Sequence, residues 1–398
     1  MRPKIALIMS ITVLMMAILA CQFPGQEETP TTAPTATMTA TETVMPTSTV
    51  EPPPDLPIFT NPIVFSLAMF TPSEGWALTR GNSSLLVTVN GGTTWFEATP
   101  PALLASTPDP TLRNFSPFFL DENAAWFTPF TSGTLYHTQD KGVTWSTTSL
   151  PFDSARYFFL DLDNGFALVD LGAGAGSQYV ALYRTDDGGV SWTEVFSHEP
   201  GVSKSLPEGG TKNGITFLDM NHGWIGGTYP MTDYFYLHYT TDGGATWSRE
   251  MDISLPGTFA GTFLDVFQPF FISATVGYLP VRVIPSSGDM QLLVYRSDDS
   301  GQTWTFQNAV LNGRDVDFSS VDEGWLAGGT ALHHTIDGGA TWTPVTTSGI
   351  PTGYYLLDVD FVDSLHGWVV TTPDDSTWEP LILYTTSDGG SNWMQLLP

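Results

Sequence analysis

Beyond residue 57, hydrophobic residues come in short runs rich in Val, Ile, Leu and aromatic side chains, and clusters of Gly, Asn, Asp and Pro separate the runs. Such runs are typical of β-strands, because successive strand side chains point to opposite faces and the separating residues favour tight turns. No long segment beyond the N-terminus has the periodicity of an amphipathic helix. We therefore predict an all-β domain over residues 58–398.

One turn pattern recurs seven times in this domain and ends each time in Trp. In residues 335–342, Thr335 stands seven residues before Trp342, Asp337 five before and Gly339 three before. The hydroxyl and the carboxylate can bond to the turn backbone, Gly allows a positive φ, and Trp can pack between sheets. Because seven equivalent binding sites would be redundant, we expect a structural role. The acidic or amide positions and the Trp positions are Asn90, Asp140, Asp187, Asp242, Asp299, Asp337 and Asp388, and Trp95, Trp145, Trp192, Trp247, Trp304, Trp342 and Trp393.

A second motif alternates with the first: an apolar run, an acidic turn, and a Gly followed by an aromatic residue, as in residues 217–224. Its fifth copy, residues 271–278, is degenerate. Together the motifs divide the domain into four-stranded units, whose size is typical of β-propeller blades. We predict a seven-bladed β-propeller of four-stranded antiparallel blades, and leave open whether residues 57–61 close the ring. The predicted blades are 58–100, 101–151, 152–199, 200–254, 255–309, 310–347 and 348–398.

The N-terminal residues predict export and lipidation. Arg2 and Lys4 supply positive charge, residues 5–19 form an apolar run, and Ala20 precedes Cys21, the only cysteine. Residues 18–21 resemble the lipobox of bacterial lipoproteins, in which the cysteine is diacylated and becomes the mature N-terminus. We expect a signal peptide over residues 1–20 and an extracytoplasmic protein anchored to the bacterial membrane through Cys21. An ordinary signal peptide and an uncleaved anchor helix are the alternatives.

A linker is expected between this leader and the domain, over residues 21–57. Residues 24–57 contain ten Thr and eight Pro but no aromatic or basic residue, a composition that cannot assemble a core. Pro-rich chains extend by about 3.1 Å per residue, so the linker can hold the domain up to roughly 100 Å from the membrane.

The charge of the chain restricts its partners. There are 41 acidic and 13 basic residues, for a formal net charge of −28. Nucleic acids and anionic lipids require a basic surface, so we expect no nucleic-acid partner and membrane contact only through the lipid. Cys21 alone cannot build a metal cage, and Asp161 and Asp163 lie in a repeated turn that lacks the distal Glu of an EF-hand. We predict no metal and no cofactor.

Binding is expected on the face opposite the Asp-containing turns, where connections within and between blades form variable loops. Aromatic residues of these loops can bind a ligand or pack against the blades. Cations at the expected starts of innermost strands can bind a carboxylate or pair with Asp315, Asp317, Asp358 and Asp360. The predicted site residues are Tyr229, Tyr234, Tyr236 and Trp378, and Arg113, Arg156, Lys212 and Arg314.

The repeated turns resemble the Asp-box, or BNR repeat, of bacterial sialidases, sortilin-type receptors and the photosystem II stability/assembly factor family. Over about residues 62–398 the resemblance is closest to the last of these families, whose repeats also join Gly-Trp strands to Asp-Gly-Gly-x-Thr-Trp boxes. This resemblance implies an assembly scaffold, although that family uses a basic patch and bases are scarce here. We predict a monomeric, surface-anchored scaffold that binds a protein or a glycan.

The alternative function is that of an exo-acting glycoside hydrolase of the sialidase type. Sialidases carry a Phe-Arg-Ile-Pro motif before the boxes, but the nearest string here, Val281-Arg282-Val283-Ile284-Pro285, lies in the fifth unit and has an extra residue. Xyloglucanase-type hydrolases pair two Asp-box propellers around a cleft, whereas this chain has material for one. Gly-x-Ser-x-Gly and His-Glu-x-x-His motifs are absent. We assign no catalytic residue.

Overall fold

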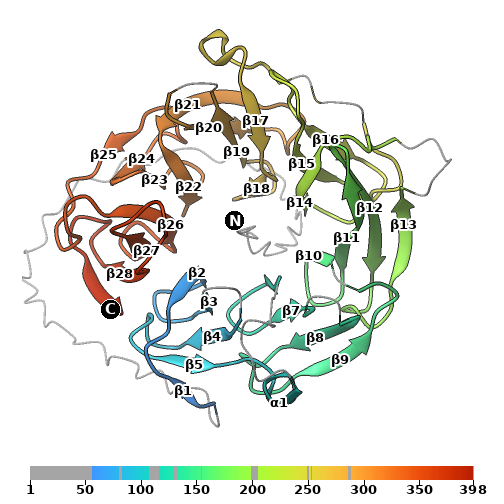
Figure 1. Ribbon diagram of the computed structural model, residues 1–398, viewed down its shortest axis with the longest axis horizontal. Helices are drawn as coiled ribbons and strands as arrows, with labels where there is room; N and C mark the ends of the chain where they lie inside the picture. Colours follow the sequence, from blue (N-terminus) through green and yellow to red (C-terminus); the bar gives the residue numbers. More distant parts are fainter. Residues whose placement is uncertain are drawn as a thin grey trace, which may run out of the picture.

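The structure is a computed structural model that describes residues 56–397 apart from residues 80–82, 107–115, 130–131, 154, 199–204, 249–250, 252 and 286–287. Antiparallel β-sheets form a ring around a central axis (Figure 1). The predicted signal peptide, Cys21, nearly all of the predicted linker and Arg113 lie outside the described residues. No helix in the described part of the chain is long and apolar enough to cross a membrane.

The first four units follow one another around the ring. The first contains β1 (Ile58–Phe59), β2 (Val64–Met69), β3 (Gly75–Thr79), β4 (Leu85–Thr88) and β5 (Trp95–Glu97), and the helix α1 (Pro101–Ser106) follows it. The second contains β6 (Phe118–Phe119), β7 (Ala125–Phe127), β8 (Thr134–Thr138) and β9 (Ser146–Ser149). The third contains β10 (Ala155–Phe159), β11 (Gly165–Gly174), β12 (Ser177–Thr185) and β13 (Thr193–Ser197). The fourth contains β14 (Thr211–Phe217), β15 (Gly223–Thr228) and β16 (Leu237–Thr240).

The last three units complete the ring. After a single 3-10 turn at Gly257–Phe259, the fifth contains β17 (Phe263–Val266), β18 (Phe270–Phe271), β19 (Gly277–Ile284), β20 (Gln291–Ser297) and β21 (Thr305–Leu311). The sixth contains β22 (Gly313–Phe318), β23 (Gly324–Gly328), β24 (Ala331–Thr335) and β25 (Thr343–Pro344). The seventh contains β26 (Tyr355–Phe361), β27 (Gly367–Thr372), β28 (Ile382–Thr386) and β29 (Met394–Leu397).

Strand pairing confirms the all-β prediction, but not every unit forms a separate sheet. Five units form separate sheets, while the fourth and fifth share an eight-stranded sheet because Thr228 of β15 pairs with Asp265 of β17. The count of seven separate blades therefore stays a prediction. β1 pairs with β5 of its own unit, with Ile58 opposite Phe96. Residues 57–61 thus extend the first sheet and do not add a strand to the seventh.

Side chains of the seventh unit close the ring. Asp358 and Asp360 of β26 accept hydrogen bonds from the backbone N–H groups of Leu67 and Met69 in β2, at 3.2 and 2.8 Å. Aliphatic and aromatic side chains of both units form one buried cluster beside these bonds. The first and last units are therefore joined without a shared strand.

The same carboxylate contacts recur at the preceding junction. Asp315 and Asp317 of β22 accept the backbone N–H groups of Val359 and Phe361 in β26, at 3.0 and 2.7 Å. In the sequence, these aspartates are candidate ion-pair partners of the cations at the starts of the innermost strands. Their contacts in the structure instead hold one innermost strand to the next.

The core lies between neighbouring sheets and contains the aromatic residues of the second motif. Trp325 of β23 stacks on Phe361 of β26, with ring centroids 3.8 Å apart and planes 3° apart, and both side chains are fully buried. Gly367 at the start of β27 leaves room for this ring, since a Cβ there would lie 2.4 Å from Phe361. The motif thus places an aromatic ring of one unit against the next.

Each Asp-box turn is held by its own side chains. In the sixth unit, Asp337 accepts the Thr341 N–H at 2.8 Å and the Thr341 hydroxyl at 2.7 Å. The Thr335 hydroxyl donates to Asp337 at 2.8 Å and accepts the Gly339 N–H at 3.0 Å. The hydrogen bonds from Thr341 lower the pKa of the Asp337 carboxyl, because they favour its charged form.

Candidate functional site

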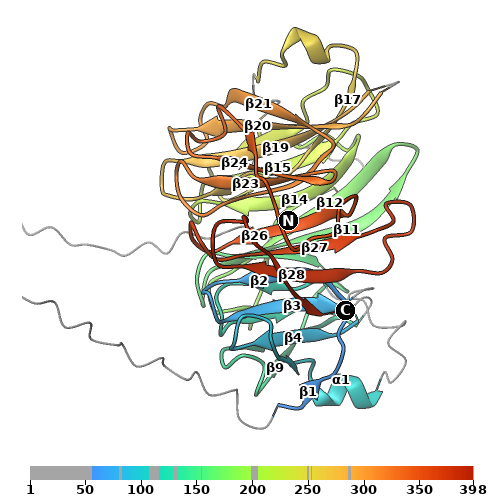
Figure 2. The ribbon, with the colours of Figure 1, turned by 90° about the vertical axis from the view of Figure 1, so that its left-hand side faces the viewer.

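Connections between the second and third strands of a unit, and those between units, lie on one side of the ring. We call this side the loop face; it includes the β11–β12 hairpin tip and residues 229–236, 288–290 and 373–381. The β11–β12 hairpin and the loop after β27 project from it (Figure 2). The Asp-box turns connect the third and fourth strands, so they lie on the opposite side.

Four large hydrophobic side chains are exposed where the strands of the fifth unit reach the loop face. Phe263 of β17 lies opposite Ile284 of β19 in the sheet register. Val283 pairs with Gln291, which places Met290 beside Ile284. Leu311, opposite Gln291, ends β21. These four side chains are between 39% and 54% exposed. Phe263, Ile284 and Met290 share one face of the sheet, and we call them the apolar ridge; Leu311 shares the face of Gln291 and points to the other side.

The ridge rests on an ordered base. Asp265, two residues after Phe263, accepts hydrogen bonds from Asn213 and from the Thr228 hydroxyl, both at 2.6 Å. It also pairs with Arg282 at 3.4 Å, and the Arg282 guanidinium lies 4.9 Å from the centre of the Phe267 ring. These contacts tie the fifth unit to the fourth. The ridge is therefore presented by strand ends that cannot move independently of the ring.

Two of the predicted cations support the junction of the third and fourth units. The Lys212 ammonium is buried and donates to the carbonyl oxygens of Gln178, Glu208 and Gly209, at 2.7, 2.9 and 3.3 Å. Burial lowers the pKa of Lys212 to about 8, although the negative charges of Glu208 and Asp170 act in the opposite direction and raise it. Arg156 donates to the Lys212 carbonyl at 2.9 Å. Lys212 is thus buried inside the protein and is not available to bind a carboxylate at the surface.

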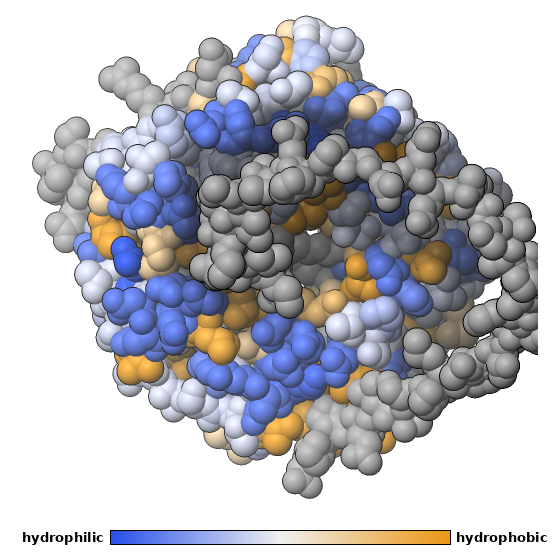
Figure 3. Space-filling view, turned by 180° about the vertical axis from the view of Figure 1, so that it is seen from behind, coloured by the Kyte–Doolittle hydropathy of each residue, from blue (hydrophilic) through white to orange (hydrophobic). Residues whose placement is uncertain are grey.

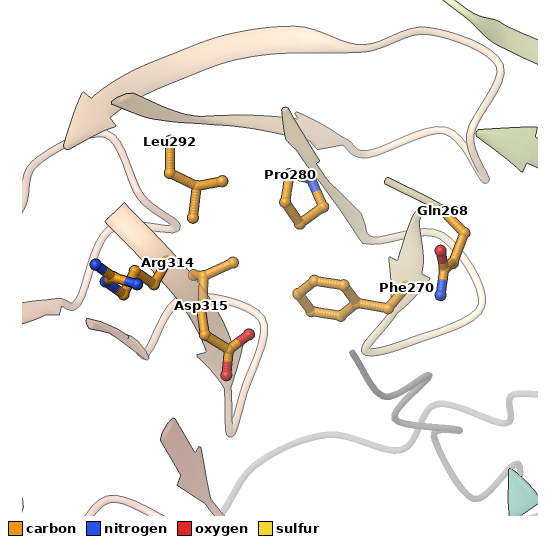
Figure 4. Close-up of a pocket in the computed structure, with 7 residues that line it drawn as sticks. Gln268, Phe270, Pro280, Leu292, Arg314 and Asp315 are labelled. Carbon is orange, nitrogen blue, oxygen red and sulfur yellow. The ribbon is translucent and has the colours of Figure 1, made fainter. Parts of the chain in front are cut away.

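The third described cation, Arg314, forms an ion pair with Asp375 in the loop after β27. The structure therefore brings Arg156 and Lys212 together but places Arg314 at a different junction. Arg314 also borders a small pocket between the fifth and sixth units. The side chains of Phe270, Pro280 and Leu292 lie around this pocket (Figure 4). The pocket is lined by Gln268, Phe270, Pro280, Leu292, Arg314, Asp315 and Val316.

Asp315 is the acidic group of this pocket. Burial and the neighbouring Asp358 carboxyl, which is hydrogen-bonded to it, raise the pKa of Asp315 well above its ordinary value. When protonated, Asp315 can donate a hydrogen bond. Its contacts with Asp358 and with the Val359 N–H show that this group helps to join two units.

The predicted tyrosines form a packed cluster at the junction of the third and fourth units. The Tyr229 and Tyr234 ring centroids are 4.5 Å apart, and those of Tyr234 and Tyr236 are 6.2 Å apart. Tyr236 is fully buried and its hydroxyl donates to the Pro207 carbonyl at 3.2 Å. Tyr229 and Tyr234 are half-buried. Tyr236 therefore packs against the blades and does not face solvent, while Tyr229 and Tyr234 retain some exposed surface.

Trp378 is the predicted aromatic residue with the most exposed surface, 41%. It belongs to the loop that also carries Asp375, and it has a positive φ of 54°. Its ring lies against Phe65 of β2, with centroids 6.4 Å apart and planes 24° apart. Trp378 therefore offers an exposed aromatic surface where the seventh unit meets the first.

Sequence reasoning did not identify the apolar ridge as a site. Ile284 and Met290 border a loop between two strands, but Phe263 lies at a strand end and has the pattern of a core residue. Residues Leu264 and Val266 of the same strand are fully buried. The alternation of side chains along a strand shows that Phe263 points to the opposite face from Leu264 and Val266. It does not show whether another part of the protein covers that face.

A family model for the BNR/Asp-box repeat matches residues 238–249. Two xyloglucanases are similar in sequence. One, from Hypocrea jecorina, is 24% identical over 286 residues, which is 66% of this chain and 29% of that protein. The other, from a Paenibacillus species, is 25% identical over 292 residues, which is 67% of this chain and 24% of that protein. The match thus spans less than a third of each relative.

Solved structures share the fold. YCF48 bound to D1 peptide has a TM-score of 0.53 at 18% identity, covering 84% of this chain and 95% of that one. YCF48 from Cyanidioschyzon merolae has a TM-score of 0.52 at 17% identity, with 84% and 98% covered. The GH74 enzyme of Niastella koreensis has a TM-score of 0.56 at 16% identity, with 84% and 54% covered. This protein is therefore a β-propeller with Asp-box repeats, similar in fold both to YCF48 and to GH74 enzymes.

Proposed function

We propose that this chain is an extracytoplasmic scaffold that binds a protein partner through its loop face and is held at the membrane by lipidated Cys21. The apolar ridge carries the proposal. Exposed hydrophobic residues are ordinary when scattered, but adjacent ones at one edge of a rigid sheet are characteristic of interaction sites. Phe263 and Ile284 are direct cross-strand neighbours, and Met290 continues the row.

The chemistry of the ridge favours a protein over a glycan as its partner. Ile284 and Met290 are aliphatic, whereas sugars are held mainly by aromatic faces and polar groups. Aromatic residues and Met are enriched in the centres of protein interfaces, with polar groups around them. Asp289, exposed beside Met290, supplies such a polar group. We expect the partner to present an apolar patch with basic residues at its edge.

Cross-linking of the full-length protein in its own membranes tests this function. The double variant Phe263→Ser and Ile284→Ser should reduce cross-linking to the partner at least about tenfold, since losing two central contacts weakens binding by more than about 1.4 kcal/mol. The matched control carries Val190→Ser and Ile336→Ser, which remove two exposed apolar side chains from the Asp-box side. Retention of every partner by the ridge variant would contradict the proposal.

A glycoside hydrolase is the second candidate, supported by the sequence similarity to xyloglucanases and by the raised pKa of Asp315. Glycosidases keep their two carboxyl groups about 5 Å or more apart, to hold a sugar or a water between them. Asp315 and Asp358 are hydrogen-bonded to each other, which favours the scaffold. Hydrolysis of xyloglucan or a fluorogenic sialoside, abolished by Asp315→Asn or Arg282→Ala, would establish the hydrolase in its place.

A further inference from the structure

Four units carry a nitrogen-bearing side chain where their third strand reaches the Asp-box side. Seen from behind, this side presents hydrophilic patches with hydrophobic areas between them (Figure 3). Each of these side chains precedes the Thr or Ser that begins an Asp box, and each lies opposite the aromatic residue of the second motif, so the four positions are equivalent. In the sheet register the pairs are His137 with Trp126, Arg184 with Phe166, Arg296 with Tyr278 and His334 with Trp325.

Arg296 shows how a cation is accommodated at this position. It forms ion pairs with Asp298, two residues later in its own unit, and with Asp322 in the second-motif turn of the next unit, both at 2.9 Å. It also donates to the Val321 carbonyl at 3.0 Å. His334 likewise has a carboxylate partner, Glu323, at 3.0 Å.

His137 has a different solution, because an imidazole can be neutral. Within the described residues, the buried Nε2 of His137 has no hydrogen-bond partner. Burial lowers the pKa of His137 and so favours its uncharged form. A guanidinium does not have this option, since arginine stays protonated in proteins.

Arg184 has neither a carboxylate partner nor a neutral form. Every other lysine and arginine in the described part of the chain donates to a carboxylate or a carbonyl oxygen, whereas Arg184 makes no hydrogen bond or ion pair there. Arg184 is half-buried. Its Nη1 lies 3.9 Å from the position that a Cβ on Gly243 would take, so the guanidinium reaches the Asp-box turn of the fourth unit.

The fourth unit lacks the carboxylate that the sixth unit supplies to Arg296. Asn221 holds the place of Asp322, since each stands two residues before the Gly of the second motif. The backbone is arranged alike at both places: the Asn221 carbonyl accepts the Gly243 N–H at 2.9 Å, and the Asp322 carbonyl accepts the Gly338 N–H at 2.8 Å. A neutral amide therefore has the position relative to Arg184 that a carboxylate has relative to Arg296.

The acidic residues that follow Arg184 do not replace that carboxylate. Asp186 corresponds to Asp298, but in the described structure it is exposed and makes no ion pair. Asp187 belongs to the Asp box and accepts the Ser191 N–H and hydroxyl, at 2.8 and 2.6 Å. The charge of Arg184 is thus left to solvent or to a ligand.

We propose that Arg184 and Asn221 form a binding site for a small ligand that carries one carboxylate, at the junction of the third and fourth units. The guanidinium donates to the carboxylate oxygens, as Arg296 does to Asp322, and the Asn221 amide donates to one of them. Asp186 and Asp187 add negative potential, so a dianion binds less well than a monocarboxylate. The site does not depend on the apolar ridge.

NMR titration of the ¹⁵N-labelled full-length protein tests the site through the Nε–H signal of Arg184, identified as the signal that Arg184→Gln lacks. Acetate and glucuronate at constant ionic strength should each shift this signal to saturation, with a dissociation constant of about 10 mM. The Arg296 signal should not shift, because its guanidinium is already paired. Tighter binding of glucuronate than of acetate would support a sugar acid as the ligand.

Two matched variants separate the proposed contact from a general effect of charge. Asn221→Asp supplies the missing carboxylate from within the chain, so it should weaken acetate binding at least about tenfold. Asn123→Asp makes the same change at the equivalent turn of the second unit, where the third-strand residue of the preceding unit is Val87, and should bind acetate as the unmodified protein does.

Three results would overturn the proposal. The first is the absence of a saturable shift of the Arg184 signal up to about 100 mM acetate. The second is tighter binding of sulfate than of acetate. The third is equal acetate binding by the Asn221 and Asn123 variants.

Discussion

At the scale of single residues, the Asp-box carboxylates act on their own turns. Asp140, Asp187, Asp242, Asp299, Asp337 and Asp388 all have a lowered pKa, and each accepts hydrogen bonds from hydroxyl or amide groups of the turn. Part of the chain's large negative charge is therefore compensated locally by backbone N–H groups. In the first turn, Asn90 accepts the Thr94 N–H at 2.9 Å, so a neutral amide can make the bond to the backbone.

Asp337→Asn should fold and lose about 0.5–1 kcal/mol of stability at pH 7, since Asn keeps one of the two bonds to Thr341. The lowered folded-state pKa means that the stabilisation by the Asp337 charge is present above the unfolded value of 3.8 and is lost as the pH falls through the folded value. The difference between the two proteins should therefore shrink between pH 5 and pH 2, as measured by urea unfolding. A difference that stays constant with pH would refute this explanation.

At the scale of strands, the Gly that begins the second strand of a unit determines how the aromatic residue of the first strand packs. A Cβ at Gly165, Gly223 or Gly367 would lie 2.4–2.5 Å from the ring of Phe159, Phe217 or Phe361. The ring therefore lies flat over the glycine and stacks on an aromatic residue of the adjacent unit. The repeated Gly is required by this contact and not by the conformation of a turn.

Gly367→Ala should destabilise the protein by about 1–3 kcal/mol, because the new methyl group must displace the buried Phe361 ring. Gly174→Ala in β11 is the matched control, since a Cβ there meets no atom within 4 Å and should change stability by less than about 0.5 kcal/mol. Chemical unfolding measures both. Equal effects of the two substitutions would show that the ring contact is unimportant.

At the scale of the whole molecule, the first and last units of the ring meet at the junction of the first and seventh units. Elsewhere neighbouring units are joined by the chain itself. At this junction, Asp358, Asp360 and the Trp368 indole bind backbone groups of the first unit. Because no chain connection joins the first unit directly to the seventh, these contacts hold the ring closed at this junction.

Asp360→Ala leaves the buried Met69 N–H without its acceptor and should cost about 1–3 kcal/mol. Asp317→Ala removes the equivalent bond to Phe361 between the sixth and seventh units, where the chain remains continuous. Hydrogen exchange should therefore accelerate across both β2 and β26 in the Asp360 variant and only around Phe361 in the Asp317 variant. Identical exchange patterns would contradict ring opening at the first junction.

The two faces of the ring are not equivalent. The repeated side was expected to be structural, and its turns do bind their own backbone, but Arg184, which has no partner in the described part of the chain, interrupts that regularity. The described loop face has no repeated motif, and its exposed hydrophobic residues include the apolar ridge, Leu171, Met231 and Trp378. Substitutions on one side can therefore be tested without altering the other side.

The sequence by itself determined the repeat, the strands and the structural turns, because those depend on residues close together in the chain. Thr335, Asp337, Gly339 and Thr341 meet within one turn, and the Gly-aromatic pattern specifies local packing. Only the tertiary structure decided the contacts between units. It buried Lys212 under carbonyl oxygens, paired Arg314 with Asp375, and joined Asp360 to Met69 across 291 residues. It also left the ridge uncovered, since exposure depends on which layers surround a strand end and not on the strand's own pattern.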